Sequence, residues 1–264
     1  SQAEIHLQTA ANRLKFGEYF YAAIEINKSY RLIQKNYKLF PKFIPNKKSL
    51  GLLYATIGSI PEKYHWILNS IGIEGNINSG LKLINEAIQE IKNSKNFEVL
   101  LEETYFLYSF LKMNLDNNND DLKTILSEII DNDNLLLKFA SNRIASKLGQ
   151  NDLAINILEN RKVEKDHYPF LYLDYLLGVN KQNKMDNSCV KHFEKYLHNF
   201  KGKNYKKSAL MRLSWHSYIN GNEIKYEHYK NLINNVNGKQ VDADKEAQSY
   251  FDKSKKPQIN LLKA

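Results

Sequence analysis

The sequence predicts an all-α fold in which antiparallel helix pairs stack side by side into a superhelix. Apolar residues recur at helical spacing along most of the chain, whereas no stretch shows the sustained apolar–polar alternation of a β-strand. A short glycine-containing pattern also recurs where one predicted helix ends and the next begins. With 264 residues, the chain has room for about twelve to fourteen helices of the length usual in such repeats.

Regular apolar spacing predicts helices over residues 18–35, 81–91 and 100–111, because each of these segments would then carry one apolar side. Two prolines bound the segment 40–46, which we expect to be a loop. The Asn- and Asp-rich segment 117–121 predicts a turn whose side chains cap the helix that follows it.

Glycine and proline also mark the end of the chain. The glycine of segment 234–238 predicts the end of a helix, and segment 253–257 is expected to be a charged loop. Pro257 favours the first turn of one more helix over residues 258–264. That helix would be the first half of a further repeat. We therefore expect one helical-repeat domain over residues 1–264 that is incomplete at its C-terminal end.

A pattern of Gly, four residues and then a small residue recurs between predicted helices. The copies begin at Gly17, Gly75, Gly149 and Gly221, followed five residues later by Ala22, Gly80, Ala154 and Tyr226. A degenerate copy is centred on Val190, which lies 36 residues from both Ala154 and Tyr226. The glycine supplies the left-handed conformation that ends the first helix, and a small side chain in the second helix lets the two helices approach closely. Each pair would then need to stack on its neighbours to cover its apolar face.

These features resemble the tetratricopeptide repeat. Leu177-Gly178 precedes Val190, and Leu213-Ser214 precedes Tyr226, at the spacing of the Leu-Gly pair of that repeat, and Thr9-Ala10 places a small residue before Ala22. A second segment resembles the signature of a tetratricopeptide-like family that includes eukaryotic outer-membrane-associated and inclusion-body-clearance proteins and bacterial members. It comprises residues 49–53, 57–61, 68–76 and 80–81. The resemblance implies a scaffolding fold and implies no catalytic motif.

The charge of the chain is positive and uneven. The net charge is +9, and residues 161–264 hold 20 basic and 11 acidic side chains. Only 5 of the 38 basic residues are arginine, the side chain that makes bidentate base contacts, so we expect no specific nucleic-acid partner. The Lys-rich third of the chain predicts either solvated helix faces or a surface for an acidic polymer or lipid headgroup.

Candidate catalytic and metal-ligating residues are sparse. The single cysteine, Cys189, is interpreted as core packing, and the seven histidines form no His-Glu-x-x-His motif. The adjacent acids Glu102-Glu103 and Asp120-Asp121 are typical of a first helical turn, because neighbours in sequence do not face each other. There is no phosphate-binding glycine loop. We expect no catalytic residue, no metal and no cofactor, and hence no enzyme.

Aromatic residues suggest a binding surface. If the first helix of each pair lines the concave face, two such helices would present Tyr172, Tyr175, Val179, Met211, Trp215 and Tyr218. An aromatic groove of this kind suits an extended or helical peptide. The alternative is that these side chains, like Trp66, pack one repeat on the next.

The sequence therefore predicts a non-enzymatic protein–protein interaction scaffold or an adaptor subunit, with other subunits as partners. The alternatives are the helical domain of an enzyme, or a module that binds an acidic polymer or lipid headgroup. The chain begins at Ser1, which fits a removed signal or tag, and we expect a bacterial periplasmic or outer-membrane-associated location, with the cytoplasm as the alternative. No apolar run is long enough for a membrane-spanning helix, although peripheral membrane association is compatible with the sequence.

Overall fold

The computed structural model describes residues 1–60, 62, 72, 74–116, 118–162, 169–238 and 240–253. Within these residues the chain forms 13 α-helices and one short 3-10 helix, and it forms no strand. Helices that follow each other in sequence pack against each other in pairs. This arrangement confirms the all-α fold of stacked helix pairs that the sequence predicts.

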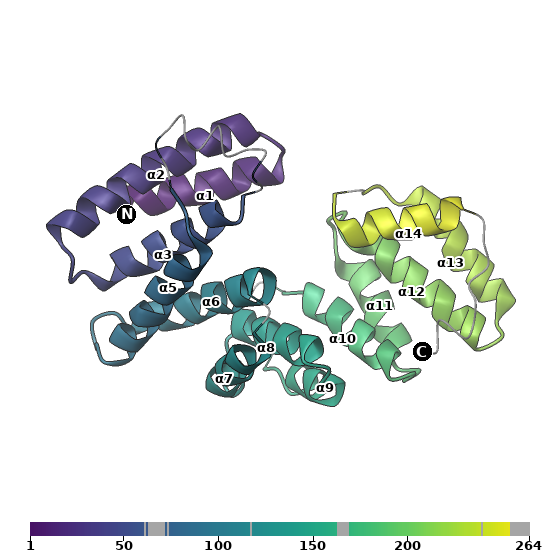
Figure 1. Cartoon of the computed structure of the whole chain (residues 1–264). Coiled ribbons are helices and arrows are strands. Elements are labelled where there is room, and N and C mark those ends of the chain that lie inside the picture. The colour runs from purple at the N-terminus through teal and green to yellow at the C-terminus, as the bar shows by residue number, and fades with distance from the viewer. Residues whose placement is uncertain are drawn as a thin grey trace. The chain divides into compact units, whose positions relative to one another are not determined.

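The chain divides into two compact units, Ser1–Ala140 and Ser141–Ala264. The first unit holds α1 (Gln2–Lys15), α2 (Tyr19–Leu39), α3 (Ile44–Gly58), α5 (Ile77–Lys92), the 3-10 helix η2 (Glu98–Leu100), α6 (Leu101–Leu115) and α7 (Asn119–Ile129). The second holds α9 (Asn151–Glu159), α10 (Tyr172–Asn183), α11 (Cys189–Asn199), α12 (Lys206–Ile219), α13 (Glu223–Asn235) and α14 (Asp242–Asp252), and α8 (Leu135–Lys147) crosses the boundary in sequence. Figure 1 shows α1 and α2 side by side in the first unit and α12, α13 and α14 grouped in the second. The expected single domain over residues 1–264 stays a prediction.

The helices predicted over residues 18–35, 81–91 and 100–111 are confirmed as α2, α5 and α6. The predicted cap is confirmed as well, because Oδ1 of Asn118 accepts hydrogen bonds from the backbone N–H groups of Asp120 (3.0 Å) and Asp121 (3.4 Å) at the start of α7. These local signals work because helix ends are fixed by neighbouring residues.

The loop predicted over residues 40–46 is shorter than expected. Helix α3 begins at Ile44, and Pro45 lies in its first turn. Proline suits this position because its missing N–H would have no partner there and its φ is already helical. The second proline therefore starts a helix rather than ending a loop.

Some predicted features lie outside the described residues. They are the packing position of Trp66, most of the 68–76 part of the family-like segment, the greater part of the charged loop over residues 253–257, and the helix over residues 258–264.

The left-handed turns predicted by the repeat pattern are present at three of the four glycines. Gly17, Gly149 and Gly221 have φ of +77°, +74° and +72°. At each of them the glycine N–H donates to the carbonyl three residues earlier, and the next N–H donates to the carbonyl five residues earlier. This pair of bonds closes a helix in the same way each time. In the degenerate copy, Met185 adopts the turn with φ of +58° and makes the same two bonds.

Small side chains follow these turns as predicted. Ala22 and Ala154 are fully buried, and Tyr226 is buried in the fourth copy. In the degenerate copy the prediction is off by one residue, because the fully buried side chain is Cys189 and Val190 is only half-buried. The path of the chain after this turn also differs, because α11 starts four residues after Met185, whereas the other second helices start two residues after their glycine.

Hydrogen bonds lock two of the pairs at equivalent positions. Asn142 Nδ2 donates to the carbonyl of Ala154 (2.9 Å), and Ser214 Oγ donates to the carbonyl of Tyr226 (3.3 Å). Each donor lies twelve residues before its acceptor, so the two bonds occupy the same place in the repeat. They give the buried carbonyls a second partner where the helices are closest.

The pattern at Gly75 and Gly80 has a different role from the one predicted. The positive φ in this stretch belongs to Gly72, not to Gly75. A Cβ at Gly75 would lie 2.5 Å from the backbone nitrogen of Gly58, and one at Gly80 would lie 2.6 Å from the carbonyl oxygen of Gly51. These glycines therefore allow α3 and α5 to touch backbone to backbone.

A buried carboxylate anchors α14. Both oxygens of Asp244 accept backbone N–H bonds at the start of α12, from Tyr205 (2.6 Å) and Ser208 (2.9 Å). A carboxylate is favourable there because the first N–H groups of a helix have no partner within it. Tyr205 is held in the left-handed region, with φ of +59°, at this junction.

We expect Gly80→Ala to destabilise the first unit by about 2 kcal/mol or more, because the added methyl would overlap the backbone of α3. Ser79→Ala, at the exposed neighbouring position, is the matched control and should change stability by less than about 0.5 kcal/mol. Urea unfolding followed by circular dichroism measures both. Equal stability of the two variants would show that α3 and α5 are not in backbone contact.

Candidate functional site

The six residues predicted to line a binding face lie on two helices of the second unit. They are Tyr172, Tyr175 and Val179 on α10, and Met211, Trp215 and Tyr218 on α12. Tyr175 and Met211 are buried, and the other four are half-buried. The shared face of the two helices is therefore not an open row of rings. The binding role of the six residues stays a prediction.

These aromatic side chains make extensive contacts inside the second unit. The Tyr175 ring stacks on Tyr172 with 5.4 Å between centroids, and its hydroxyl lies 2.8 Å from Ser208 Oγ. Trp215 meets Tyr250 of α14 edge to face at 5.2 Å. Helix α14 thus covers part of the face that was expected to be open to a partner. Its Ala247, Tyr250 and Phe251 follow helical spacing and could have signalled this helix.

Cys189 is placed beside a histidine but is not accessible. Its Sγ lies 3.6 Å from Nδ1 of His216, a pairing that can activate a thiol. However, Cys189 is fully buried, and this burial raises the pKa of the thiol to about 11, so the thiol stays protonated at neutral pH. The packing role predicted for Cys189 is confirmed by its burial.

The adjacent carboxylates lie where the sequence predicts. Glu102 and Glu103 are in the first turn of α6, and Asp120 and Asp121 are in the first turn of α7, where they face the positive end of the helix dipole. Across the part of the chain that the structure describes, no three His, Cys, Asp or Glu side chains are grouped so that they could hold a metal ion.

An apolar pocket of about 510 Å³ opens in the first unit, where α1 and α3 begin and α2 ends. Its apolar lining includes Leu32, Phe43, Pro45, Phe97, Val99 and Leu100. Volume and lining fall in the range of sites that receive one large apolar group. We call this feature the apolar pocket.

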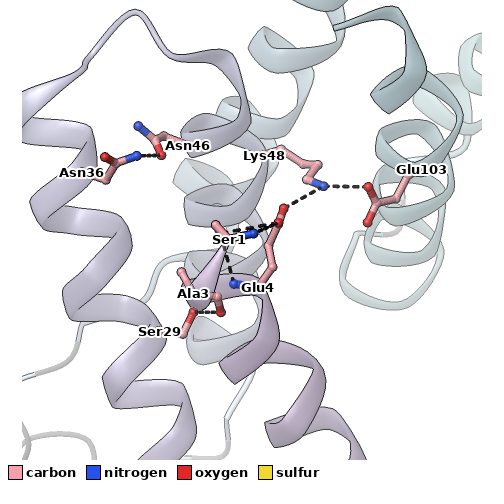
Figure 2. Close-up of polar contacts among 8 residues, drawn as sticks. All are labelled: Ser1, Ala3, Glu4, Ser29, Asn36, Asn46, Lys48 and Glu103. Atoms are coloured by element: carbon pink, nitrogen blue, oxygen red, sulfur yellow. Dashed lines mark hydrogen bonds and ion pairs between the residues drawn. The ribbon is translucent and has the colours of Figure 1, made fainter.

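Polar contacts hold the helix ends around the apolar pocket. Asn36 Nδ2 donates to Oδ1 of the buried Asn46 (2.7 Å), which ties α2 to α3. Ser29 Oγ donates to the carbonyl of Ala3 (2.8 Å) and ties α2 to α1. Figure 2 shows both bonds on the helices that meet at the pocket. These two bonds therefore hold in place the helix ends that line the pocket.

A buried lysine completes this network. Lys48 of α3 is almost fully buried, and its Nζ lies 3.3 Å from a Glu4 carboxylate oxygen and 2.7 Å from one of Glu103 (Figure 2). The ammonium thus links α3 to both α1 and α6. A buried cation needs such partners, because an unpaired charge would lose its hydration without compensation.

The same arrangement occurs at two other buried lysines. Lys112 pairs with Asp116 (2.7 Å) and Asp121 (2.5 Å), and Lys181 pairs with two acids in the same way. The partners of Lys181 are Glu159 (2.6 Å) and Asp186 (3.1 Å). These contacts raise the pKa of Lys112 and of Lys181, so both side chains remain charged.

Exposed apolar residues surround the mouth of the apolar pocket. Val99 is 85% exposed, and Phe43 is also exposed although its ring packs edge to face on Phe97 at 5.6 Å. Phe40, three residues before Phe43, is also exposed, and its carbonyl accepts a bond from Asn46, which lines the pocket. The sequence did not predict this site, because only folding brings Phe43 and Val99 together from segments more than fifty residues apart. The two phenylalanines around Pro41 are its one local signal.

A second, more polar pocket of about 490 Å³ lies in the second unit between α9, α10 and α11. Asp174 is buried in its wall and pairs with Arg161 (2.7 Å) and Lys195 (3.1 Å). The positive charge of these two basic side chains is thus partly neutralised by the Asp174 carboxylate. His192 also lines this pocket, and its Nε2 is buried without a hydrogen-bond partner among the described residues.

No family model, no curated protein and no solved structure matches the chain. The resemblance to tetratricopeptide proteins therefore stays an expectation. Of the helices in the described ranges, none combines the length and apolarity needed to cross a membrane.

We expect acid to destabilise the second unit through His192. Burial lowers the pKa of His192 from its ordinary 6.5 to about 4, so the folded chain disfavours the charged ring. The protein therefore has its full free energy of unfolding above pH 6.5, and the part that depends on a neutral His192 is lost as the pH falls towards 4. His192→Gln should retain about 1 to 2 kcal/mol more of its pH 7 stability at pH 4.5 than the unmodified chain does.

His198→Gln, at an exposed position on the same helix, is the control. Urea unfolding of all three proteins at pH 7 and pH 4.5 gives the comparison. If the two variants lose stability in parallel, His192 does not contribute to the acid sensitivity.

Proposed function

We propose that this chain is a non-enzymatic scaffold for protein–protein interaction, an adaptor subunit of a larger assembly. One observation carries the proposal: the first unit holds an open apolar pocket whose lining includes the exposed side chains of Phe43 and Val99. Soluble surfaces rarely leave such groups together unless something binds them.

The shape of the pocket suits a single large apolar side chain from a partner protein. A pocket bordered by exposed apolar side chains is typical of the place where a partner anchors a large side chain. Covering about 100 Å² of apolar surface contributes about 2.5 kcal/mol. The Asn36–Asn46 bond and the ion pairs of Lys48 already fix the helix ends, so little ordering is needed when the partner binds.

The setting we propose is a bacterial cell-envelope complex, at the periplasmic face or the outer membrane. The support is the resemblance to scaffolding repeat families, in which stacked helix pairs present surfaces to other proteins. Binding of an acidic polymer by the basic third of the chain has less support, because Arg161 and Lys195 both pair with Asp174 in the polar pocket.

We expect Val99→Asp to abolish capture of the main partner, because a carboxylate at the mouth would have to be desolvated when the pocket is covered. Tagged chain is used to capture proteins from native soluble and membrane fractions, and mass spectrometry identifies what is enriched. With the purified partner, the dissociation constant should rise at least about tenfold, which corresponds to 1.4 kcal/mol.

Ile224→Asp is the matched control, since Ile224 is 86% exposed on α13 in the second unit and lies outside the pocket. It should retain the partner. Two results would contradict the proposal: retention of the same partner by Val99→Asp, or its loss from both variants alike.

A further inference from the structure

The turn between α1 and α2 carries four exposed aromatic residues. Phe16, Tyr19, Phe20 and Tyr21 are 67%, 71%, 73% and 56% exposed, and we call them the aromatic tip. They flank the left-handed turn at Gly17, which joins the two helices. Exposed rings at this density mark an interaction surface.

The turn geometry does not require aromatic side chains. The equivalent turns at Gly149, Met185 and Gly221 have the same pair of backbone hydrogen bonds. The three residues that occupy the positions of Tyr19, Phe20 and Tyr21 are Asn151, Asp152 and Leu153 after Gly149, and Glu223, Ile224 and Lys225 after Gly221. The aromatic tip is therefore specific to the first pair and serves something other than folding of the turn.

The rings point in several directions. Tyr19, Phe20 and Tyr21 are the first three residues of α2, and successive helical residues are about 100° apart, so the three side chains spread over about 200°. Phe16 lies on the other side of the turn, after the end of α1. A flat protein surface or a helix groove covers one side of a helix, whereas a fluid medium surrounds a protruding turn on all sides.

Cations lie directly behind the tip. The Arg13 guanidinium is 5.1 Å from the centroid of the Tyr21 ring and pairs with Glu18 at 2.7 Å, and Lys15 Nζ is 6.0 Å from the Phe16 ring. Aromatic rings favour the boundary between water and lipid, and flanking basic side chains favour the phosphates there. This arrangement matches a membrane surface better than a protein one.

We propose that the aromatic tip inserts into the lipid–water interface and holds the first unit on a membrane surface. The rings of Phe16, Tyr19 and Phe20 enter among the headgroups and upper acyl chains. Arg13 and Lys15 remain at the phosphate level. Because the apolar contacts carry the binding, it occurs on zwitterionic lipid and is strengthened only modestly by anionic lipid.

Vesicle flotation tests this proposal with phosphatidylcholine vesicles, with and without phosphatidylglycerol, at 0.1 and 0.5 M NaCl. The unmodified chain should bind both compositions, and F16S/Y19S/F20S should lower the partition coefficient at least tenfold. F110S/I224S is the matched control, because it removes two exposed apolar side chains that lie elsewhere, on α6 and α13, and it should bind within twofold of the unmodified chain. Circular dichroism confirms that both variants stay folded, since all of these side chains lie outside the core.

A reporter variant tests the depth of insertion. Phe20→Trp keeps an aromatic ring at the tip, and its emission should shift to the blue on vesicles and be quenched by brominated lipid. Ile224→Trp should show neither change. Equal quenching of both reporters, or binding that disappears entirely at 0.5 M NaCl, would overturn the proposal.

The test also separates lipid from protein as the occupant. If the unmodified chain binds no vesicles but F16S/Y19S/F20S loses a captured protein, the tip docks into a protein pocket and the lipid proposal is wrong. Because the partner-binding proposal is tested at Val99 and the lipid proposal at the aromatic tip, either can fail without the other.

Discussion

The close approach of two helices at a small buried side chain is the constraint on which this fold depends. A left-handed turn reverses the chain within two residues, so the second helix starts directly against the first. Only a small group fits where they meet, and Ala22 and Ala154 supply it. Where the larger Tyr226 takes this place, the facing residue is the small Ser214, so the small side chain comes from the first helix instead of the second. The stacking of pairs follows from this spacing, because each pair presents ridges at fixed intervals.

The contact between α3 and α5 satisfies the same constraint by another route. Here glycines from both helices replace the left-handed turn and the small side chain, and the backbones touch. Such a contact gains dense packing but tolerates no added methyl group. Helix α3, which this contact holds against α5, also carries Pro45 of the apolar pocket and the buried Lys48.

Local signals in the sequence predicted the helices and most of their ends, because caps and left-handed turns involve residues within one turn of each other. They did not predict Met185 in a left-handed conformation, which is unusual for a side chain of its size and is imposed by the pair it joins. The two surfaces that we propose for binding differ in the same way. The aromatic tip is continuous in sequence and could have been recognised, whereas the apolar pocket joins Phe43 to Val99 and exists only after folding. The six residues predicted on α10 and α12 lie on those helices, but the exposure of Trp215 depends on α14, which Asp244 anchors to the start of α12.

The three lysines enclosed by paired acids change how the charge of this protein should be counted. Lys48, Lys112 and Lys181 each carry one positive charge into a site that holds two carboxylates, so each site is a small negative centre within a basic chain. Each of these sites has a net charge of −1, so the rest of the chain carries more positive charge than the total of +9 suggests. Amine-reactive labels would also divide the lysines into two groups. These three would react slowly, since their ammonium groups are buried and each is paired with two acids, and a reactivity map would therefore trace the helix junctions of the fold.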